Sequence, residues 1–270
     1  MSAAFSLPPP PAAPAVPPAP LVSVVVPAHN EEAYLEEALT AIVEGVRVRH
    51  LAGEVVVVEN GSTDRTVEVA RRAAAGRPEI RVLQLRRADY GAALRAGFRA
   101  ARGELVANFD VDLVDLAFLD RALDRLGADP SLDVVIGTKR GAGADDRRTA
   151  GRRLVTGTFS LVMRYGFGLR VSDTHGLKLL RADPLRPLVD RVRSSRDLFD
   201  TELVLRAERA GLRLAEIPVT VEEQRPPRTP ILRRVPRTVA GLARLRLRLW
   251  QAGRPAGDRP AGGGPVAAGR

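Results

Sequence analysis

The chain has 270 residues, a formal net charge of +10 at pH 7 and no cysteine. This length is enough for one substantial domain, and the absence of cysteine excludes disulfides and thiolate metal sites. The positive charge calls for an anionic partner, for which membrane lipid and nucleic acid are the obvious choices. Aromatic residues make up only 4% of the chain, which leaves few platforms on which bases could stack, and no nucleic-acid-binding module is recognisable. We therefore expect no nucleic-acid partner.

Both ends of the chain have the composition of disordered tails. Residues 1–20 are broken by prolines and lack a basic start, which fits neither a signal peptide nor a membrane span. Residues 252–270 are rich in Gly, Pro and Ala and are expected to be flexible. Between the tails, we expect one α/β domain over residues 21–225 and a basic amphipathic segment over residues 226–251.

Four apolar runs are predicted as strands, and each precedes a helical pattern. The strands are predicted at 22–26, 55–58, 80–85 and 105–109, and the helices at 35–43, 67–75, 92–101 and 116–126. Ser62 or Thr63 is expected to cap the second helix. Strand–helix units in series indicate a parallel sheet with right-handed crossovers. A further strand is predicted at 134–137.

Two carboxylates, Asp110 and Asp112, directly follow the fourth predicted strand. They should lie in a loop at the carboxyl end of that strand, the edge where ligands bind in open α/β sheets. Mg²⁺ and Mn²⁺ prefer oxygen ligands, and Mg²⁺ often combines one or two carboxylates with water and phosphate oxygens. A phosphorylated substrate is therefore implied. Taken alone, the pair is better explained as loop residues or caps of the following helix.

Linked motifs give the chain a family resemblance. In chain order they are VVVPAHNEE, VVVVENGSTDRT, YGAALRAGFRAARGELV, FDVDL, VIGTKR, SDTHGLKLLR and FDTELVLRAERAGLRLAEIPV. The first four resemble the amino-terminal half of family 2 glycosyltransferases with the GT-A fold. The others resemble the polyprenyl-phosphate sugar transferases, the group of dolichyl-phosphate mannose and glucose synthases. The resemblance covers residues 21–225 and implies a GT-A catalytic domain, with a mostly parallel, Rossmann-like sheet sandwiched by helices.

The resemblance also implies where a sugar nucleotide would bind. The residues assigned to its base and ribose are Pro27, His29, Asn30, Glu31, Glu59 and Asn60. Asp110 and Asp112 would hold Mg²⁺ or Mn²⁺ on its diphosphate. The family usually has an aromatic residue in place of His29 and an Asp in place of Glu59, and many mannosyl transferases have a Gln in place of Val114. The base and any third metal ligand therefore stay open.

The acceptor decides which further groups the chemistry needs. Breaking a sugar–diphosphate bond builds negative charge on the departing phosphate, which a metal stabilises. A lipid phosphate acceptor is already ionised and needs no general base, whereas an alcohol needs a carboxylate within hydrogen-bond reach. Asp173, Asp200 and Glu202 are the candidates, of which Asp173 and Glu202 are expected to be catalytic beside the Asp110 and Asp112 pair.

An anionic acceptor also needs basic side chains opposite the donor. Guanidinium groups suit phosphate oxygens because they bind them in a bidentate manner. The candidates for the acceptor phosphate are Arg140, Arg153, Lys178 and Arg225. Because the chain is rich in arginine, a solvated surface position is an alternative explanation for each of them.

Basic residues are concentrated late in the chain, over residues 231–250. A helix that begins near Pro236 would place four apolar side chains on one side and Trp250 at a membrane interface. These side chains are Val239, Leu242, Leu245 and Leu249. The alternation over residues 244–249 also fits a strand. The segment is too charged to span a bilayer, so as a helix it would lie on a membrane or pack against the domain.

The expected function is metal-dependent, inverting transfer of a hexose from a nucleoside-diphosphate sugar to a polyprenyl phosphate. The protein would be cytoplasmic and peripherally associated with an anionic membrane surface. An alternative is a soluble transferase acting on a hydroxyl of a small-molecule acceptor. A third hypothesis is a non-catalytic protein that binds a nucleotide sugar or a membrane. The sugar, the base, the acceptor length and the oligomeric state stay open.

Overall fold

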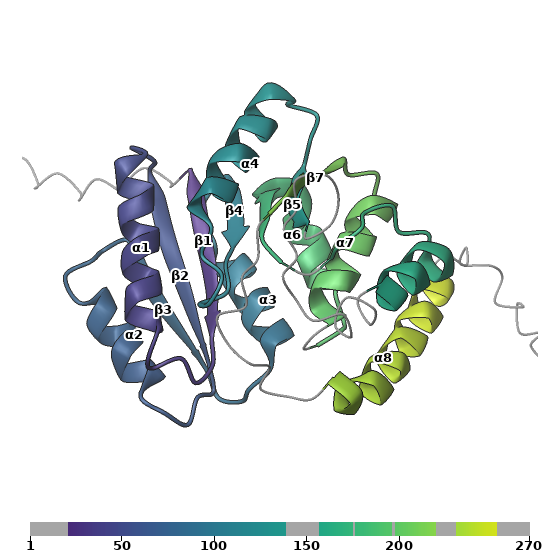
Figure 1. The fold of residues 1–270 in the computed structure, drawn as a ribbon, viewed down its shortest axis with the longest axis horizontal. Helices are drawn as coiled ribbons and strands as arrows, with labels where there is room; N and C mark the ends of the chain where they lie inside the picture. Colours follow the sequence, from purple (N-terminus) through teal and green to yellow (C-terminus); the bar gives the residue numbers. More distant parts are fainter. Residues whose placement is uncertain (1–20, 139–156, 175, 196–197, 220–230, 253–270) are drawn as a thin grey trace, which may run out of the picture.

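The computed structural model describes residues 21–138, 157–174, 176–195, 198–219 and 231–252, and of residues 231–235 only the backbone. The strands are β1 (Val22–Ala28), β2 (Gly53–Asn60), β3 (Ile80–Leu85), β4 (Leu105–Asn108), β5 (Val134–Thr138), β6 (Lys178–Arg181) and β7 (Leu214–Pro218). The helices are α1 (Leu35–Val48), α2 (Thr66–Ala74), α3 (Tyr90–Ala100), α4 (Leu116–Ala128), the π-helix η1 (Val162–Gly166), α6 (Ala182–Arg191), α7 (Phe199–Arg209) and α8 (Ile231–Ala252). Figure 1 shows their arrangement.

All of these strands form one sheet in the order β3-β2-β1-β4-β6-β5-β7. Neighbours from β3 to β4 are parallel, β6 is antiparallel to both β4 and β5, and β7 is parallel to β5. The predicted α/β class with a mostly parallel sheet is therefore confirmed. The antiparallel strand β6 was not predicted, and it joins the amino-terminal half of the sheet to β5 and β7.

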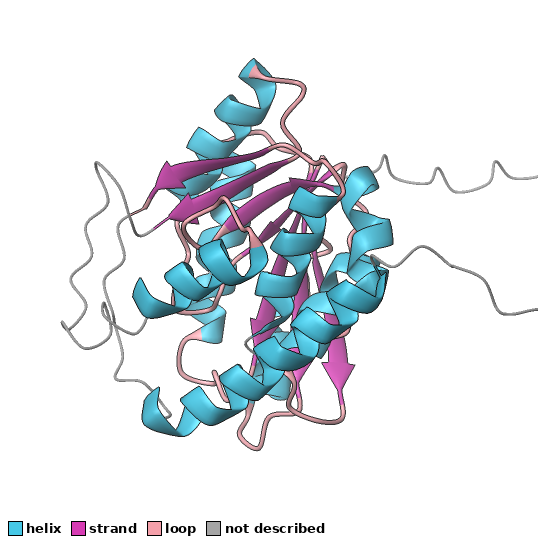
Figure 2. Cartoon of the chain, turned by 90° about the vertical axis from the view of Figure 1, so that its right-hand side faces the viewer, coloured by secondary structure: helices cyan, strands magenta, loops and turns pink. Residues whose placement is uncertain are grey.

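The central strands are buried on both faces, which explains their continuous runs of valine. Successive side chains of β1 alternate between two apolar cores: Val24 and Val26 pack with α1 and α4, whereas Val25 packs with α3, α6 and α7. Helices thus cover both faces of the sheet, as Figures 1 and 2 show. The two cores fix the strand ends relative to one another, which is what a site at the sheet edge requires.

Helix α3 lies very close to β1 at Gly97. A Cβ atom at this position would lie 2.3 Å from Val25 Cγ1 and 3.2 Å from Val58 Cγ2. We expect Gly97→Ala to lower the free energy of unfolding by about 1–3 kcal/mol, because overpacking outweighs the gain in helix propensity. Urea unfolding measures this change. In the control, Gly127→Ala in α4, the new Cβ meets nothing within 4 Å, and equal stability of both variants would contradict the prediction.

The amino terminus of α4 distinguishes between the two interpretations of Asp110 and Asp112, namely helix caps and metal ligands. Asp115 is the N-cap residue, and its Oδ1 accepts a hydrogen bond of 2.7 Å from the backbone N–H of Phe118. The role of helix cap is therefore filled by a third aspartate. Asp110 and Asp112 precede it in a short turn, in which the N–H of Leu113 donates to the backbone O of Asp110 at 3.0 Å.

Helix α8 decides between the alternatives for the basic segment: the segment is a helix, and it packs against the domain. It is helical from Ile231, before Pro236, so the strand alternative is excluded. Leu242, Leu245 and Leu249 are buried in the core that contains α7, and Figure 1 shows α7 and α8 in the same half of the molecule. The expectation that these leucines face a membrane is therefore wrong, because the domain itself covers them. In the described part of the chain, no helix is both long and apolar enough to cross a membrane.

Candidate active site

The carboxyl ends of three neighbouring strands bring the predicted site residues together. Ala28 is in register with Glu59, so the loop after β1 begins beside the end of β2. On the other side of β1, Val25 is in register with Asn108, which places Asp110 after β4 at the same edge. The sheet order therefore positions the residues after β1, at the end of β2 and after β4 around one location.

A series of hydrogen bonds connects these strand ends. His29 Nδ1 donates to the backbone O of Asn60 at 2.9 Å, which places the ring proton on Nδ1 because a carbonyl oxygen only accepts. Asn60 Oδ1 accepts from the N–H of Asp89 at 2.8 Å. The next residue, Tyr90, donates from its hydroxyl to Asp110 Oδ1 at 3.0 Å. The site thus includes the start of α3, and Tyr90 was not predicted.

The loop after β1 is held by the loop after β2. Asn30 adopts a positive φ of 55°, its N–H donates to Ser62 Oγ at 3.0 Å, and its Oδ1 accepts from the N–H of Thr63 at 2.8 Å. The prediction that Ser62 or Thr63 caps α2 is wrong, because α2 follows Arg65 without a side-chain cap. Gly61 is required at its positive φ of 63°, since a Cβ there would lie 2.8 Å from the backbone of Ala88.

Glu59 is a fully buried carboxylate at this edge. Its Oε1 accepts a hydrogen bond of 2.6 Å from the N–H of Ser62, whereas its Oε2 has no hydrogen-bond partner within the described structure. A buried acceptor without a partner is costly, so Oε2 is suited to receive an N–H or O–H donor from a ligand. The other two residues assigned to the nucleotide lie nearby: Pro27 is in register with Val58, and the N–H of Glu31 donates to Thr66 Oγ1 at 2.8 Å.

Three aspartates interact electrostatically at the end of β4. Burial, followed by the negative charges of Asp200 and Asp112, raises the pKa of Asp110 to about 6, and the hydrogen bond from Tyr90 and the charge of Lys178 oppose this rise. Burial, followed by the negative charges of Asp110 and Asp200, raises the pKa of Tyr90 well above its usual value. We call Asp110, Asp112 and Asp200 the acidic cluster. Lys178 pairs with Asp200, so one ammonium group faces three carboxylates, and the remaining negative charge favours cation binding.

The acidic cluster fits a divalent metal held by few protein ligands. Asp110 and Asp112 supply hard oxygen donors, which Mg²⁺ and Mn²⁺ prefer. Among the described residues, no group of three or more His, Cys, Asp or Glu side chains is placed to hold a metal ion together. Two carboxylates would therefore hold the metal, and substrate phosphate oxygens and water would complete its coordination.

The structure gives Lys178 a different role from the predicted one. Its side chain is fully buried, and its Nζ donates to Asp200 Oδ1 and to the backbone O of Gly176, each at 2.8 Å. The expectation that Lys178 contacts an acceptor phosphate is therefore wrong for this conformation, because the ammonium group is enclosed. Instead, it compensates Asp200 beneath the acidic cluster.

Glu202 is likewise not placed as a catalytic base. Its carboxylate is fully buried and accepts hydrogen bonds from Arg206 Nη2 at 2.6 Å and from the N–H of Ser194 at 2.7 Å. These interactions lower the pKa of Glu202 despite its burial. The prediction of a catalytic role is therefore wrong, because Oε1 is held by Arg206 of the same helix and Oε2 by the backbone of the loop before α7.

The remaining predicted residues divide into two groups. Asp173 lies in the loop before β6, where its N–H and that of Ser172 donate to Glu216 Oε1 at 3.2 and 2.8 Å. Its predicted catalytic role stays a prediction. The other acceptor candidates, Arg140, Arg153 and Arg225, lie outside the described residues, as does His175.

The chain belongs to glycosyl transferase family 2, because residues 23–188 match the profile of that family. The fold is of the GT-A type, as the sequence resemblance implied. Two relatives at 31–32% identity cover 75–85% of this chain, which is more than the region that matches the profile. The acidic cluster of this family member lies at the sheet edge that holds the predicted donor residues.

Several relatives and solved structures are similar to this chain. Glycosyltransferase AglD of Haloferax volcanii is 32% identical over 85% of this chain and 37% of its own length. Dolichyl-phosphate beta-glucosyltransferase ALG5A of Trichomonas vaginalis is 31% identical over 75% of this chain and 66% of its own length. A mannosyltransferase of Pyrobaculum calidifontis, solved with GDP-Man and Mn²⁺, has a TM-score of 0.59 and 26% identity over 87% of this chain and 66% of that one. The chain spans less than two thirds of each of these proteins.

Proposed function

We propose that this glycosyltransferase transfers a hexose from a nucleoside-diphosphate sugar to a polyprenyl phosphate, with inversion and with the help of Mg²⁺ or Mn²⁺. The acidic cluster next to the loops after β1 and β2 is the observation that carries the proposal. A dolichyl-phosphate glucosyltransferase among the relatives supports the lipid acceptor, and a mannosyltransferase solved with GDP-Man and Mn²⁺ supports the metal and the donor class.

The residues around the acidic cluster would have different roles in the transfer reaction. Asp110 and Asp112 would hold the metal, which when bound stabilises the charge that develops on the departing diphosphate. Tyr90 would orient the carboxylate of Asp110 through its 3.0 Å hydrogen bond, and Lys178 would keep Asp200 in place. A lipid phosphate attacks as an anion, so no residue has to remove a proton from it. This agrees with the engagement of Glu202 in structural hydrogen bonds.

The donor nucleotide would lie between the loops after β1 and β2. Glu59 Oε2, buried and without a protein partner, would accept an N–H or O–H of the nucleotide. We expect Glu59→Gln to weaken binding of the matching nucleoside diphosphate about 10-fold, because the variant keeps the shape and loses the charged acceptor. Calorimetry with UDP, GDP and dTDP measures this. Glu37→Gln, an exposed change on α1, is the control, and equal affinities of both variants would contradict the prediction.

The exposed side of α8 supports peripheral contact with an anionic membrane at its cytoplasmic face. Val239, Leu247 and Trp250 are 60%, 53% and 57% exposed, and they lie within one stripe of the helix at 100° per residue. Helix η1 lies beside α8, since Arg246 Cζ is 5.8 Å from the ring centroid of Phe167, the residue that follows η1. Tyr165 of η1 is also exposed. Arginines flank the stripe and α8 contains no acidic residue, an arrangement that suits an anionic lipid surface.

Transfer of radiolabelled sugar tests the proposal. Full-length protein is incubated with UDP-, GDP- and dTDP-sugars, a polyprenyl phosphate, and either Mn²⁺ or EDTA, and label is counted in the organic phase. We expect one donor class to label the lipid only with the metal. Label that appears only in water-soluble products with small-molecule alcohols would instead support the hydroxyl acceptor, and binding without turnover would support a non-catalytic protein.

A further inference from the structure

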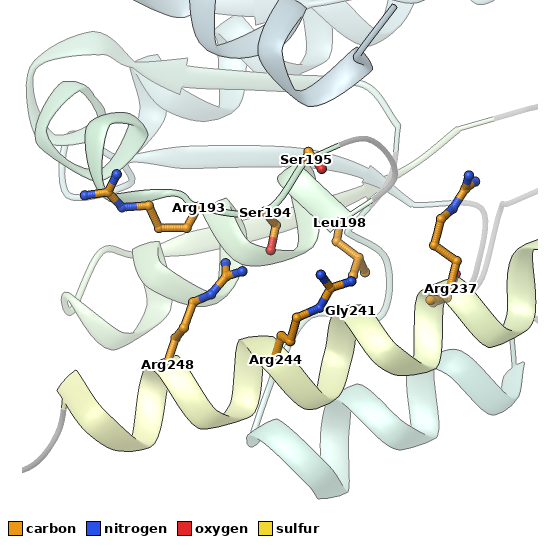
Figure 3. A pocket seen from close by; sticks show the side chains of 9 residues that line it. Arg193, Ser194, Ser195, Leu198, Arg237, Gly241, Arg244 and Arg248 are labelled. Carbon is orange, nitrogen blue, oxygen red and sulfur yellow. The ribbon is translucent and has the colours of Figure 1, made fainter.

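A second, strongly basic pocket lies between α8 and the loop that precedes α7, away from the acidic cluster. Its lining residues are Arg193, Ser194, Ser195, Leu198, Arg237, Thr238, Gly241, Arg244 and Arg248. Figure 3 shows Arg244 and Arg248 extending from α8 toward the loop that carries Ser194 and Leu198. We call it the arginine pocket. Four of these nine residues are arginines and three carry hydroxyl groups, whereas none is acidic.

The positive charge of Arg248 is only partly compensated by the described residues around it. Glu202 is a nearby carboxylate, and its Oε1 is bound by Arg206 at 2.6 Å. Arg248 Nη1 lies 3.8 Å from Glu202 Oε2, which is too long for a hydrogen bond. This nitrogen is buried and has no hydrogen-bond partner in the described structure. A buried guanidinium nitrogen in this condition indicates an absent acceptor.

The walls of the arginine pocket are held in place by specific contacts. Arg95 Nη2 donates to the backbone O of Val192 at 2.8 Å, and Glu202 accepts the N–H of Ser194 at 2.7 Å, so residues 192–194 are held by both α3 and α7. On α8, Gly241 packs closely on Leu198, because a Cβ there would lie 2.3 Å from Leu198 Cδ1. The arginines therefore project from a packed frame, which lowers the entropic cost of binding a ligand.

The arginine pocket and the acidic cluster lie on different sides of α7. Asp200 and Glu202 are two residues apart, which separates their directions by about 200° around the helix. Asp200 faces Lys178 and Asp110, whereas Glu202 faces Ser194 and Arg248. A ligand in the arginine pocket would thus be separate from the donor and its metal.

We propose that the arginine pocket binds a phosphate-bearing anion, either a soluble phosphate or diphosphate or the headgroup of an anionic lipid. Guanidinium forks bind phosphate oxygens in a bidentate manner, and hydroxyl groups such as those of Ser195 and Thr238 can donate to the remaining oxygens. Both sources offer the same chemistry. The exposed stripe of α8, on the same helix, makes a lipid headgroup accessible, whereas a soluble anion needs no membrane.

The test compares two probes on the full-length protein. Calorimetry with inorganic pyrophosphate is performed in EDTA, which removes metal-dependent binding at the acidic cluster. Sedimentation with phosphatidylcholine vesicles, with or without phosphatidic acid, measures headgroup binding. The pocket variant is Arg237→Gln with Arg244→Gln, and the control is Arg246→Gln, which removes a charge from the same helix next to Phe167. Ser195→Glu, which adds a carboxylate at an exposed lining position, is a second pocket variant in case the first unfolds.

We expect both pocket variants to weaken binding about 10-fold or more while the control stays within about twofold. Loss of pyrophosphate affinity assigns the pocket to a soluble anion, whereas loss confined to the vesicles with phosphatidic acid assigns it to a headgroup. Equal losses in pocket and control variants would show that only overall charge matters. That result, or no binding of either probe by the unaltered protein, would overturn the proposal.

Discussion

Asp110→Asn and Asp112→Asn should each reduce sugar transfer by at least about 100-fold, the scale on which a preorganised electrostatic contribution is lost. Both substitutions keep the shape of the side chain and remove a negative charge that the metal needs. The initial rate of lipid labelling at saturating Mn²⁺ measures the effect. Asp115→Asn is a matched control in the same segment, because asparagine caps a helix as well as aspartate does and Asp115 only caps α4.

We expect these Asp→Asn variants to be as stable as the unaltered protein. Unchanged stability with lost transfer would show that the two aspartates act in the reaction rather than in folding. The pKa of Asp110 is raised from 3.8 to about 6, so the folded state binds this proton more tightly than the unfolded state does. Between about pH 4 and 6 the contribution of Asp110 to stability falls as the pH rises, and at pH 7 its charge opposes folding. Asp110→Asn should therefore melt at the same or a higher temperature at pH 7. Transfer rates within twofold of the unaltered protein would contradict the assignment.

Lys178→Met should produce the largest loss of stability, about 3–5 kcal/mol, because it leaves a buried charge without its partner. Asp200 would then face Asp110 and Asp112 without the ammonium group that now lies 2.8 Å from its Oδ1. Urea unfolding measures the change. The double variant Lys178→Met with Asp200→Asn should recover most of the loss, since no buried charge is left unpaired.

An exposed ion pair gives the comparison for this prediction. Arg186 and Asp183 pair at 3.1 Å with side chains that are 50% and 93% exposed, so Arg186→Met should cost less than about 1 kcal/mol. If Lys178→Met cost no more than Arg186→Met, the buried pair would not stabilise the acidic cluster as we infer.

The amino-terminal half of the fold could be predicted from the sequence because its signals are local. The valine runs of β1 and β2 and the helical periodicity of α1 and α3 define strand–helix units without reference to the rest of the chain. Strands β6 and β7 were missed because charged residues interrupt their short apolar runs: β6 begins with the buried Lys178, and β7 contains Glu216. Its position between β4 and β5 depends on long-range pairing, which no local pattern reveals.

The residues of the candidate site also fall into those that the sequence predicted and those that it did not. Residues that directly follow predicted strands, such as Glu59 and Asp110, were found because parallel strand ends meet at one sheet edge. Tyr90 and the place of Asp200 in the acidic cluster were not, since both come from helices whose approach depends on the fold. For Lys178 and Glu202 the residue type suggested function, and burial with a specific partner showed a supporting role instead.

Helix α8 illustrates a separate limit of sequence patterns. Of the predicted stripe, Leu242, Leu245 and Leu249 form a buried apolar face, whereas the placement of Val239 on that face is wrong because its side chain is exposed. The pattern also does not show what covers the face. The domain covers it, and a different stripe with Leu247 and Trp250 remains exposed. The arginine pocket arises from the same packing, because its walls come from α8 and from a loop about 40 residues earlier in the chain.

Binding of Mn²⁺ in the presence of a nucleoside diphosphate tests the central claim most directly. Free Mn²⁺ is followed by electron paramagnetic resonance while the protein is titrated with and without UDP or GDP. We predict that one nucleotide creates a tight Mn²⁺ site in the unaltered protein and that Asp110→Asn with Asp112→Asn abolishes it, while Asp115→Asn retains it. Nucleotide-dependent Mn²⁺ binding that survives the double substitution would contradict the assignment of the acidic cluster as the metal site of this protein.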